Sequence, residues 1–316
     1  MDLPDNLRSL GDLRSRYRRT RRGTQAGGIA FVFQGGGSLS APQVGMLRAL
    51  SEAGVRPDLV VGSSAGALNA VAFAADPTQA GVERLETVWM SLRRRNVARF
   101  SGRTLLAAAL GRGDGLVSNS GLRDLLRTAA LPATLDGTSI PAHVVATDLG
   151  TGAAVVLSGG PTGPALLASC AFPGLYPPVE VDGRLLVDGG VSADVPVLQA
   201  EALGARVIYV LPAAGCDVTA PPPHRPLPLA FHALSQVLGS VAATNVAAAR
   251  GPVHVLPAPS SQTTSPVDFR DTPRLIDQGY QLTARWLASQ RADRPASPDL
   301  PDLGVAGAGP RMAGAS

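Results

Sequence analysis

One serine, Ser64, lies in a context where a hydroxyl can act as a nucleophile. It stands between Gly62 and Gly66, after an apolar run that ends at Val61 and before an alanine-rich run to Ala75. We predict a strand, a tight turn and a helix here, because such a turn leaves no room for side chains beside the serine. Glycine makes up 36 of 316 residues, so the motif alone also arises by chance. The flanking strand and helix therefore carry the prediction of acyl-transfer chemistry.

A second glycine-rich segment, Gly35-Gly36-Gly37, follows an apolar run and precedes a predicted helix. Such a loop exposes backbone N–H groups that could hold an anion. A dinucleotide-binding loop would need glycine where Ser40 stands, and a phosphate-binding P-loop would need a lysine, which this chain lacks. Two interpretations remain: a simple tight turn, or an oxyanion hole in which the Gly36 and Gly37 amides face a carbonyl oxygen that becomes negative.

A carboxylate, Asp188, comes before Gly189 and Gly190 at the end of a short apolar strand. We expect it at the carboxyl edge of an open parallel sheet, where ligands bind. None of the four histidines occupies a loop after a late strand, where a Ser-Asp-His triad would place its base. A two-residue Ser64–Asp188 mechanism therefore competes with a triad, and the histidines are expected to be structural or solvated.

The elements that must position these residues alternate between strands and helices. We predict strands at 28–33, 55–61, 142–147, 153–157, 185–187, 207–211 and 253–256, the last at a sheet edge, and helices at 42–53, 78–95, 121–130, 164–169, 196–203, 229–250 and 272–289. The helix at 78–95 is expected to end in three arginines, and the apolar stretch 105–110 could form a lid. The alternation favours an α/β fold, with a mostly parallel sheet covered on both faces.

Composition describes a globular chain, with 45% hydrophobic and 16% charged residues. The net charge of +4 equals the excess of seven arginines over three aspartates within residues 1–26, so the remainder gives no sign of nucleic-acid binding. The arginine-rich segment predicts either a solvated disordered arm or peripheral contact with anionic membrane lipid. Two cysteines without metal-ligand spacing fit a reducing compartment, and no apolar run is long enough to span a bilayer. We expect a cytoplasmic protein without a transmembrane segment.

These motifs occur in an order that resembles the patatin-like phospholipase family. The resemblance rests on Gln34 to Gly37, Gly62-x-Ser64-x-Gly66, Ala168 to Pro173 with Pro177-Pro178-Val179, and Asp188-Gly189-Gly190. It covers about residues 27–212 and implies a three-layer α/β/α sandwich that hydrolyses acyl esters of lipids without a cofactor or metal. By position, Ser64 would be the nucleophile, Asp188 the base, and Gly35, Gly36 and Gly37 the oxyanion loop, with Gly62, Gly66, Gly189 and Gly190 supporting the turns.

The chain departs from the family pattern at two positions. The family usually has glycine where Ser40 stands, and we expect Ser40 to cap the helix that follows. The family often has asparagine where Asp194 stands. That carboxylate could raise the pKa of a neighbour or be solvated, and we expect it to be solvated.

The predicted organisation is an arm at 1–26, a catalytic domain at 27–212, a Pro-rich linker with helices at 213–290 packed on the same domain, and a flexible tail at 291–316. Two alternatives to lipid hydrolysis stay open. One is a general carboxylesterase or thioesterase that acts on soluble acyl substrates. The other is a non-catalytic lipid-binding protein on the same fold.

Overall fold

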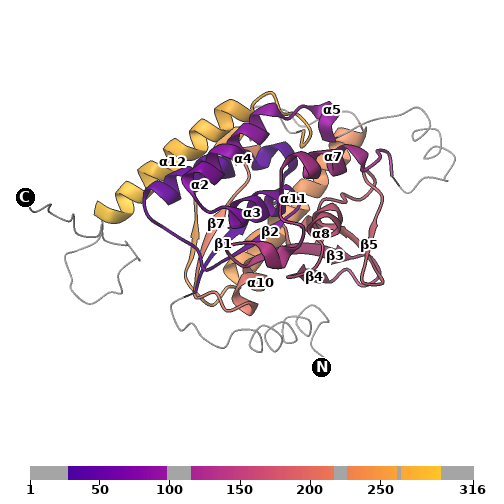
Figure 1. The fold of residues 1–316 in the computed structure, drawn as a ribbon, viewed down its shortest axis with the longest axis horizontal. Helices are drawn as coiled ribbons and strands as arrows, with labels where there is room; N and C mark the ends of the chain where they lie inside the picture. Colours follow the sequence, from indigo (N-terminus) through magenta and orange to yellow (C-terminus); the bar gives the residue numbers. More distant parts are fainter. Residues whose placement is uncertain (1–27, 98–114, 217–225, 262–264, 293–316) are drawn as a thin grey trace, which may run out of the picture.

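The chain is built around one eight-stranded sheet in the computed structural model, which describes residues 28–97, 115–216, 226–261 and 265–292 (Figure 1). The predicted arm, the apolar stretch 105–110 and nearly all of the predicted tail lie outside the described residues. The strands are β1 (Ile29–Phe33), β2 (Leu59–Ser63), β3 (Ala142–Asp148), β4 (Ala154–Leu157), β5 (Val179–Val181), β6 (Arg184–Asp188), β7 (Val207–Leu211) and β9 (Val253–Val255). A separate pair joins β8 (Gly215–Cys216) to β10 (Ser260–Ser261).

The sheet has a parallel centre and an antiparallel side. Its order is β5-β6-β3-β2-β1-β7-β9, with β4 also paired to β3. The pairs from β3 through β2, β1 and β7 to β9 are parallel, whereas β4 and β6 pair antiparallel with β3, and β5 pairs antiparallel with β6. The expectation of a mostly parallel sheet is thus confirmed, with β9 at one edge as predicted.

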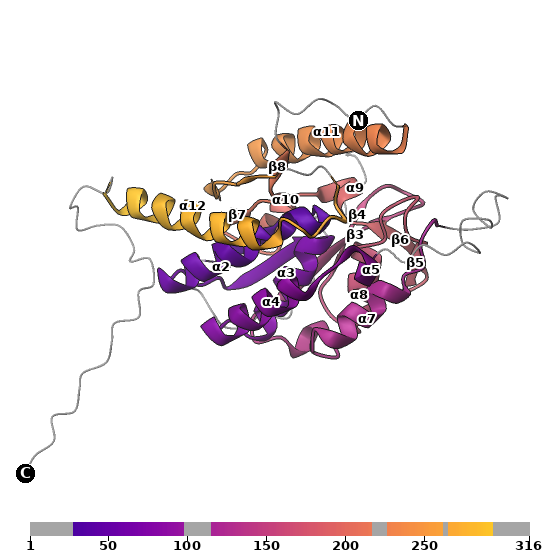
Figure 2. The same cartoon turned by 90° about the horizontal axis from the view of Figure 1, so that it is seen from above.

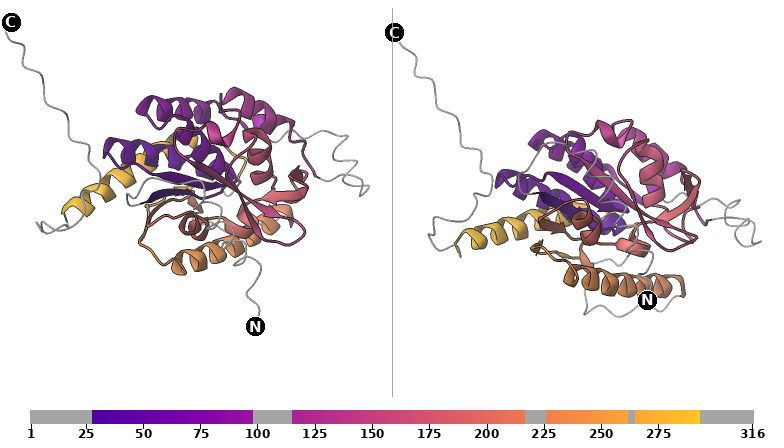
Figure 3. Two further views of the ribbon diagram at one scale, coloured as in Figure 1. Left: turned by 60° about the horizontal axis from the view of Figure 1, so that its bottom comes forward. Right: turned by 90° about the horizontal axis from the view of Figure 1, so that it is seen from below.

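Helices cover both faces of this sheet and make three layers (Figures 2 and 3). They are α2 (Pro42–Glu52), α3 (Ala65–Ala75), α4 (Gln79–Ser91), α5 (Arg94–Val97), α7 (Ser120–Thr128), α8 (Thr162–Ser169), α9 (Gly190–Ala193), α10 (Val197–Ala202), α11 (Pro226–Ala247) and α12 (Thr272–Ala292), with 3-10 turns η1 (Gly37–Ser40) and η2 (Leu135–Gly137). Among the described residues no helix is both long and apolar enough to cross a bilayer.

Alternation along β1 explains why the core has two halves. Phe31 and Phe33 belong to a cluster with residues of α2, α3, α4 and α12, whereas Ala30 and Val32 belong to another with residues of α9, α10 and α11. Successive side chains of a strand point to opposite faces, so a strand buried on both faces is apolar throughout. This is the α/β/α sandwich that the sequence predicted.

The two largest differences from the predicted bounds are in the second strand and in the helix predicted at 78–95. The second strand begins at Leu59 rather than at residue 55, and the Asp58 carboxylate just before it accepts the Ile29 N–H at 2.8 Å. The helix predicted at 78–95 ends at Ser91, because Leu92 is extended. Of the three arginines expected at its end, Arg94 and Arg95 lie in the separate helix α5, and Arg93 precedes that helix.

Candidate active site

Ser64 occupies the sharp turn between β2 and α3. Its backbone angles are φ 52° and ψ −130°, a region that costs a non-glycine residue about 1–3 kcal/mol and is common at functional sites. A Cβ on Gly66 would lie 2.4 Å from the Gln34 carbonyl oxygen, so only glycine allows α3 to start this close to β1. The side chain is partly exposed and lies at the first turn of α3. The strand-turn-helix context predicted for Ser64 is therefore present.

Asp188 lies beside Ser64, and the strand register explains why. Ser63 pairs with Val145 of β3, and Asp188 pairs with Ala146, the next residue of β3. The Ser64 hydroxyl donates a hydrogen bond of 2.6 Å to Asp188 Oδ2. The sequence argument placed Asp188 at the carboxyl edge of a parallel sheet, but β6 runs antiparallel to β3. The two residues meet because β6 ends level with the turn, not because the strands are parallel.

Burial changes the chemistry of the Asp188 carboxyl. Its exposed fraction is 3%, and desolvation raises its pKa from 3.8 to about 7. Hydrogen bonds from Ser64 and from the Gly190 N–H, the latter 2.8 Å long to Oδ1, oppose this rise, and the nearby charge of Asp194 adds to it. A carboxylate that exchanges its proton near neutral pH is a competent general base.

The triple-glycine loop lies against the serine. A Cβ on Gly35 would be 3.2 Å from Ser64 Cβ, and the Gly35 N–H donates to the Asp194 carbonyl oxygen at 3.2 Å. Within the described part of the chain, the Gly36 and Gly37 amides donate no hydrogen bond. Gly37 has φ 59°, and a Cβ there would be 2.2 Å from the Pro266 carbonyl oxygen. Two unused donors therefore lie in the loop that contacts Ser64.

Asp194 is only partly exposed and is hydrogen-bonded within the protein, contrary to the expectation of a solvated carboxylate. Its Oδ2 accepts a hydrogen bond of 2.8 Å from Gln34 Nε2, and a Cβ on Gly35 would approach its Oδ1 to 2.6 Å. Burial raises the Asp194 pKa, and the Gln34 hydrogen bond partly offsets this rise. The alternative considered for this residue, a carboxylate that raises the pKa of its neighbour Asp188, agrees with its position.

Ser40 does not cap the helix that follows it. It is fully buried in η1, and its hydroxyl donates to the Gln34 carbonyl oxygen at 3.4 Å. The residue before α2 is Ala41, which makes no side-chain capping bond. Ser40 therefore contacts the start of the glycine loop through Gln34. The prediction that it caps the following helix is wrong.

The segment Ser169-Cys170-Ala171 links the serine to the aspartate. The Ser169 hydroxyl accepts the Ser64 N–H at 2.9 Å and donates to the Val145 carbonyl oxygen at 2.6 Å. The Ala171 carbonyl accepts the Asp188 N–H at 3.0 Å. Burial and the Asp188 charge raise the pKa of the Cys170 thiol, and a hydrogen bond with Ser64 lowers it by a smaller amount. In the sequence this block supports the family resemblance, but nothing there assigns Ser169 a role of its own.

The described histidines do not contact either residue of the pair. His143 lies within β3 and bonds through Nδ1 to the Ser158 hydroxyl at 2.8 Å, and His254 packs against Tyr209 and Trp286. His232 lies on α11, and His224 is outside the described residues. The geometry available for proton transfer is therefore the contact between Ser64 and Asp188.

Comparison with known proteins places this arrangement in a family. The family model described as "Patatin-like phospholipase" matches residues 31–201, more than half of the chain, and spans Ser64, Asp188 and the glycine loop. The chain belongs to the patatin-like phospholipase family. The resemblance seen in the sequence is thereby confirmed.

Patatin-like relatives occur in bacteria and animals. An uncharacterized NTE family protein of Mycobacterium tuberculosis is 33% identical over 179 residues, which are 56% of this chain and 46% of the relative. Patatin-like phospholipase domain-containing protein 7 of Rattus norvegicus is 28% identical over 210 residues, 66% of this chain and 15% of the relative. The matches thus span half or less of these relatives. The solved structure of VipD from Legionella pneumophila aligns with 84% of this chain and 67% of its own at a TM-score of 0.41 and 15% identity.

Proposed function

We propose that this patatin-like protein is a serine acyl hydrolase that cleaves acyl esters of lipids, with Ser64 as nucleophile and Asp188 as base. The observation that carries the proposal is the 2.6 Å hydrogen bond from the Ser64 hydroxyl to Asp188 Oδ2 at a strained turn. A serine hydroxyl is a weak nucleophile unless an adjacent base accepts its proton. A carboxyl whose pKa is about 7 can both accept that proton and return it.

In the first step, the Ser64 oxygen attacks the ester carbonyl carbon while its proton passes to Asp188. The Gly36 and Gly37 amides have no described partner and would donate to the oxyanion of the tetrahedral intermediate. The C–O bond of the ester then breaks, and Asp188 gives the proton to the departing alcohol or lysolipid. An acyl-Ser64 remains.

In the second step, a water molecule loses a proton to Asp188 and attacks the acyl-Ser64 carbonyl. The same two amides would hold the second oxyanion. Collapse of the intermediate returns the proton to the Ser64 oxygen and releases a fatty acid. Removal of one such donor typically lowers the rate on the order of a hundredfold or more.

The test uses purified full-length protein and a panel of phospholipids and fluorogenic esters. Ser64→Ala and Asp188→Asn are each expected to lower hydrolysis at least a thousandfold while circular dichroism stays unchanged. Ser63→Ala is the matched control, because Ser63 is the adjacent buried serine and its hydroxyl has no described partner. It is expected to keep most of the activity.

Active-site labelling identifies the nucleophile separately. A fluorophosphonate should add once to the wild type and to Ser63→Ala, and not to Ser64→Ala, by intact mass. An active Asp188→Asn variant would exclude the proposed base. Equal rates on monomeric and emulsified esters would instead indicate a soluble acyl substrate, and full-length protein that neither labels nor hydrolyses would contradict the assignment as an enzyme.

A further inference from the structure

A cavity lies between α7 and α8, lined by none of the residues of the Ser64 site. Its volume is about 280 Å³, just below the usual range of roughly 300–1,000 Å³ for small-molecule pockets. The lining residues are Arg123, Leu126, Arg127, Leu131, Pro132 and Ala133 from α7 and the segment after it, and Thr162, Gly163, Pro164, Leu166 and Leu167 from α8.

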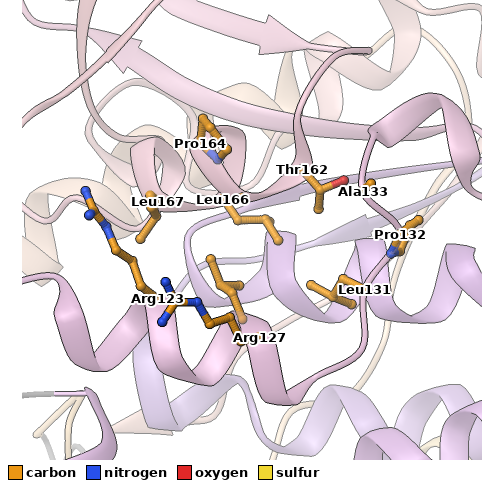
Figure 4. A pocket seen from close by; sticks show the side chains of 11 residues that line it. Arg123, Arg127, Leu131, Pro132, Ala133, Thr162, Pro164, Leu166 and Leu167 are labelled. Carbon is orange, nitrogen blue, oxygen red and sulfur yellow. The ribbon is translucent and has the colours of Figure 1, made fainter.

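The cavity has a charged end and an apolar middle. Figure 4 shows Arg123 and Arg127 at one end, Thr162 with Pro132 and Ala133 at the other, and leucine side chains between them. The two arginines are four residues apart, so they lie on the same face of α7. An elongated ligand would therefore lay an apolar body over the leucines and its charge beside the arginines.

The arginines keep most of their capacity to bind an anion. The Arg123 side chain is exposed and makes no hydrogen bond or ion pair with another described residue. Arg127 contacts Asp124 at 3.3 Å, but its side chain stays 80% exposed, and pairs of this kind contribute little. Two neighbouring guanidinium groups provide paired N–H donors that suit a carboxylate or a phosphate.

Apart from the two arginines, Thr162 is the only lining residue with a polar side chain that could bind the anionic group of a ligand instead. It is 3% exposed, and its hydroxyl is buried with no hydrogen-bond partner in the described part of the chain. A hydrogen bond from a neutral hydroxyl is weaker than one from a charged guanidinium. The anionic group of a ligand is therefore expected at the arginine end and the end of the apolar chain near Thr162.

We propose that this cavity binds a single-chain anionic amphiphile, with its head group on Arg123 and Arg127 and its chain over Leu126, Leu131 and Leu166. The head group can be the carboxylate of a fatty acid or the phosphate of an acidic single-chain lipid. This site is separate from Ser64 and stands on its own contacts, so it does not depend on the proposed hydrolysis.

The experiment measures equilibrium binding to full-length Ser64→Ala protein, which removes turnover from the readout. Dodecanoate and dodecyl phosphate are titrated separately, with dodecanol as the uncharged analogue. At least one anion is expected to bind ten or more times as tightly as dodecanol, and the tighter anion identifies the head group. Equal affinity for dodecanol would overturn the proposal.

Two double variants, which have the same net charge as each other, test the arginines. Arg123→Glu with Arg127→Glu is expected to weaken binding of the preferred anion at least tenfold. The matched control is Arg206→Glu with Arg285→Glu, whose exposed side chains lie outside this cavity, and it is expected to stay within about twofold of the parent. Equal loss in both proteins would reduce the effect to general charge attraction and contradict a specific site.

Crosslinking tests where the ligand binds, and a Thr162 variant tests which end of the cavity holds its carboxylate. A diazirine-bearing dodecanoate should crosslink within residues 120–133 or 162–167, and crosslinks confined to other segments would place the ligand elsewhere. Thr162→Val removes the hydroxyl at nearly constant volume and should leave dodecanoate affinity within about threefold. A tenfold loss would put the carboxylate on Thr162 and overturn the assignment to the arginines.

Discussion

At the residue scale, the Asp188 carboxyl combines burial with a proposed role as a base, which needs its charge. Its pKa is about 7, mainly because of desolvation, and only its ionised form can accept the Ser64 proton. We expect kcat/KM for ester hydrolysis to rise with pH through a midpoint near 7 and then level off. A pH profile on a non-ionising ester measures this. A rate that is constant from pH 5 to 9 would contradict Asp188 as the base.

The raised pKa of Asp188 also affects stability, but it favours the folded state at low pH, whereas the proposed activity needs high pH. The Asp188 pKa is about 7 in the folded protein against 3.8 for an ordinary carboxyl, so its protonated form favours folding at low pH. That contribution is complete below pH 3.8 and is lost as the pH rises through 7. Asp188→Asn should therefore be more stabilising at pH 8.5 than at pH 4.5, by roughly 2–4 kcal/mol. Urea unfolding of both proteins at the two pH values measures the difference, and a pH-independent effect would refute it.

Ser169 holds the backbone of Ser64, the proposed nucleophile. Its hydroxyl joins the Ser64 N–H to the Val145 carbonyl oxygen, so Ser169→Ala removes one hydrogen bond from each of these backbone groups. We expect kcat to fall about ten- to a hundredfold with KM within about twofold, because Ser169 is fully buried and would act through Ser64. The Ser63→Ala protein is the control for a buried serine that lacks such bonds. A rise in KM with unchanged kcat would contradict a positioning role.

At the element scale, a buried polar network holds the loop that carries the glycines. Asn69 Nδ2 donates to Gln43 Oε1 at 2.8 Å and to the Ser40 carbonyl oxygen at 3.2 Å, and Asn69 Oδ1 accepts the Trp89 Nε1–H at 2.7 Å. Gln43 Nε2 in turn donates to the Gln34 carbonyl oxygen at 2.7 Å. Helices α2, α3 and α4 are thereby tied to the loop before η1.

Asn69→Ala should break this network at its centre. It removes three hydrogen bonds inside the core and leaves Trp89 Nε1 without its acceptor, at a cost of about 1–3 kcal/mol for each buried group left unpaired. We expect the free energy of unfolding to fall by at least about 2 kcal/mol in urea. Asn119→Ala, in the loop before α7, is the matched control, because its side chain makes no capping bond. Equal stability of both variants would show that the network contributes little.

The sequence predicts the elements of this site better than their contacts. Local signals are sufficient for the Ser64 turn and the glycine loop, because apolar runs bounded by glycines identify a strand, a turn and a helix. The direction of β6 is not local, since it depends on pairing with β3, and the bonded residues Thr147 and Asp188 are 41 positions apart in the sequence. Asp194 was misjudged for the same reason: its partner Gln34 is 160 residues away.

At the scale of the whole molecule, the site depends on a segment that follows the family match. The match ends at residue 201, yet the Pro266 carbonyl oxygen accepts the Ser38 N–H at 2.7 Å next to the glycine loop. Helix α12 follows this segment and buries Leu275 and Ile276 in the core cluster that contains α2. The proposal that residues 213–290 belong to the same folding unit as residues 27–212 is supported by these contacts.

The crossing of α2 and α12 gives that proposal a test, because the helices meet at glycines. A Cβ on Gly45 would lie 1.9 Å from the Ile276 carbonyl oxygen, so Gly45→Ala must push α12 away from α2. We expect it to lower the free energy of unfolding by about 2 kcal/mol or more and to lower ester hydrolysis, since displacement of α12 would move Pro266 from the glycine loop.

Gly239→Ala provides the matched control, because it makes the same substitution inside helix α11 where a Cβ meets no atom within 4 Å. Alanine has the higher helix propensity, so this variant should gain up to about 1 kcal/mol and keep its activity. If Gly45→Ala unfolds in two separate transitions, with ester hydrolysis unchanged, then α12 is not part of the same cooperative unit. A single transition at lower urea, with activity lost in parallel, would mean that the C-terminal helix and the glycine loop fold together.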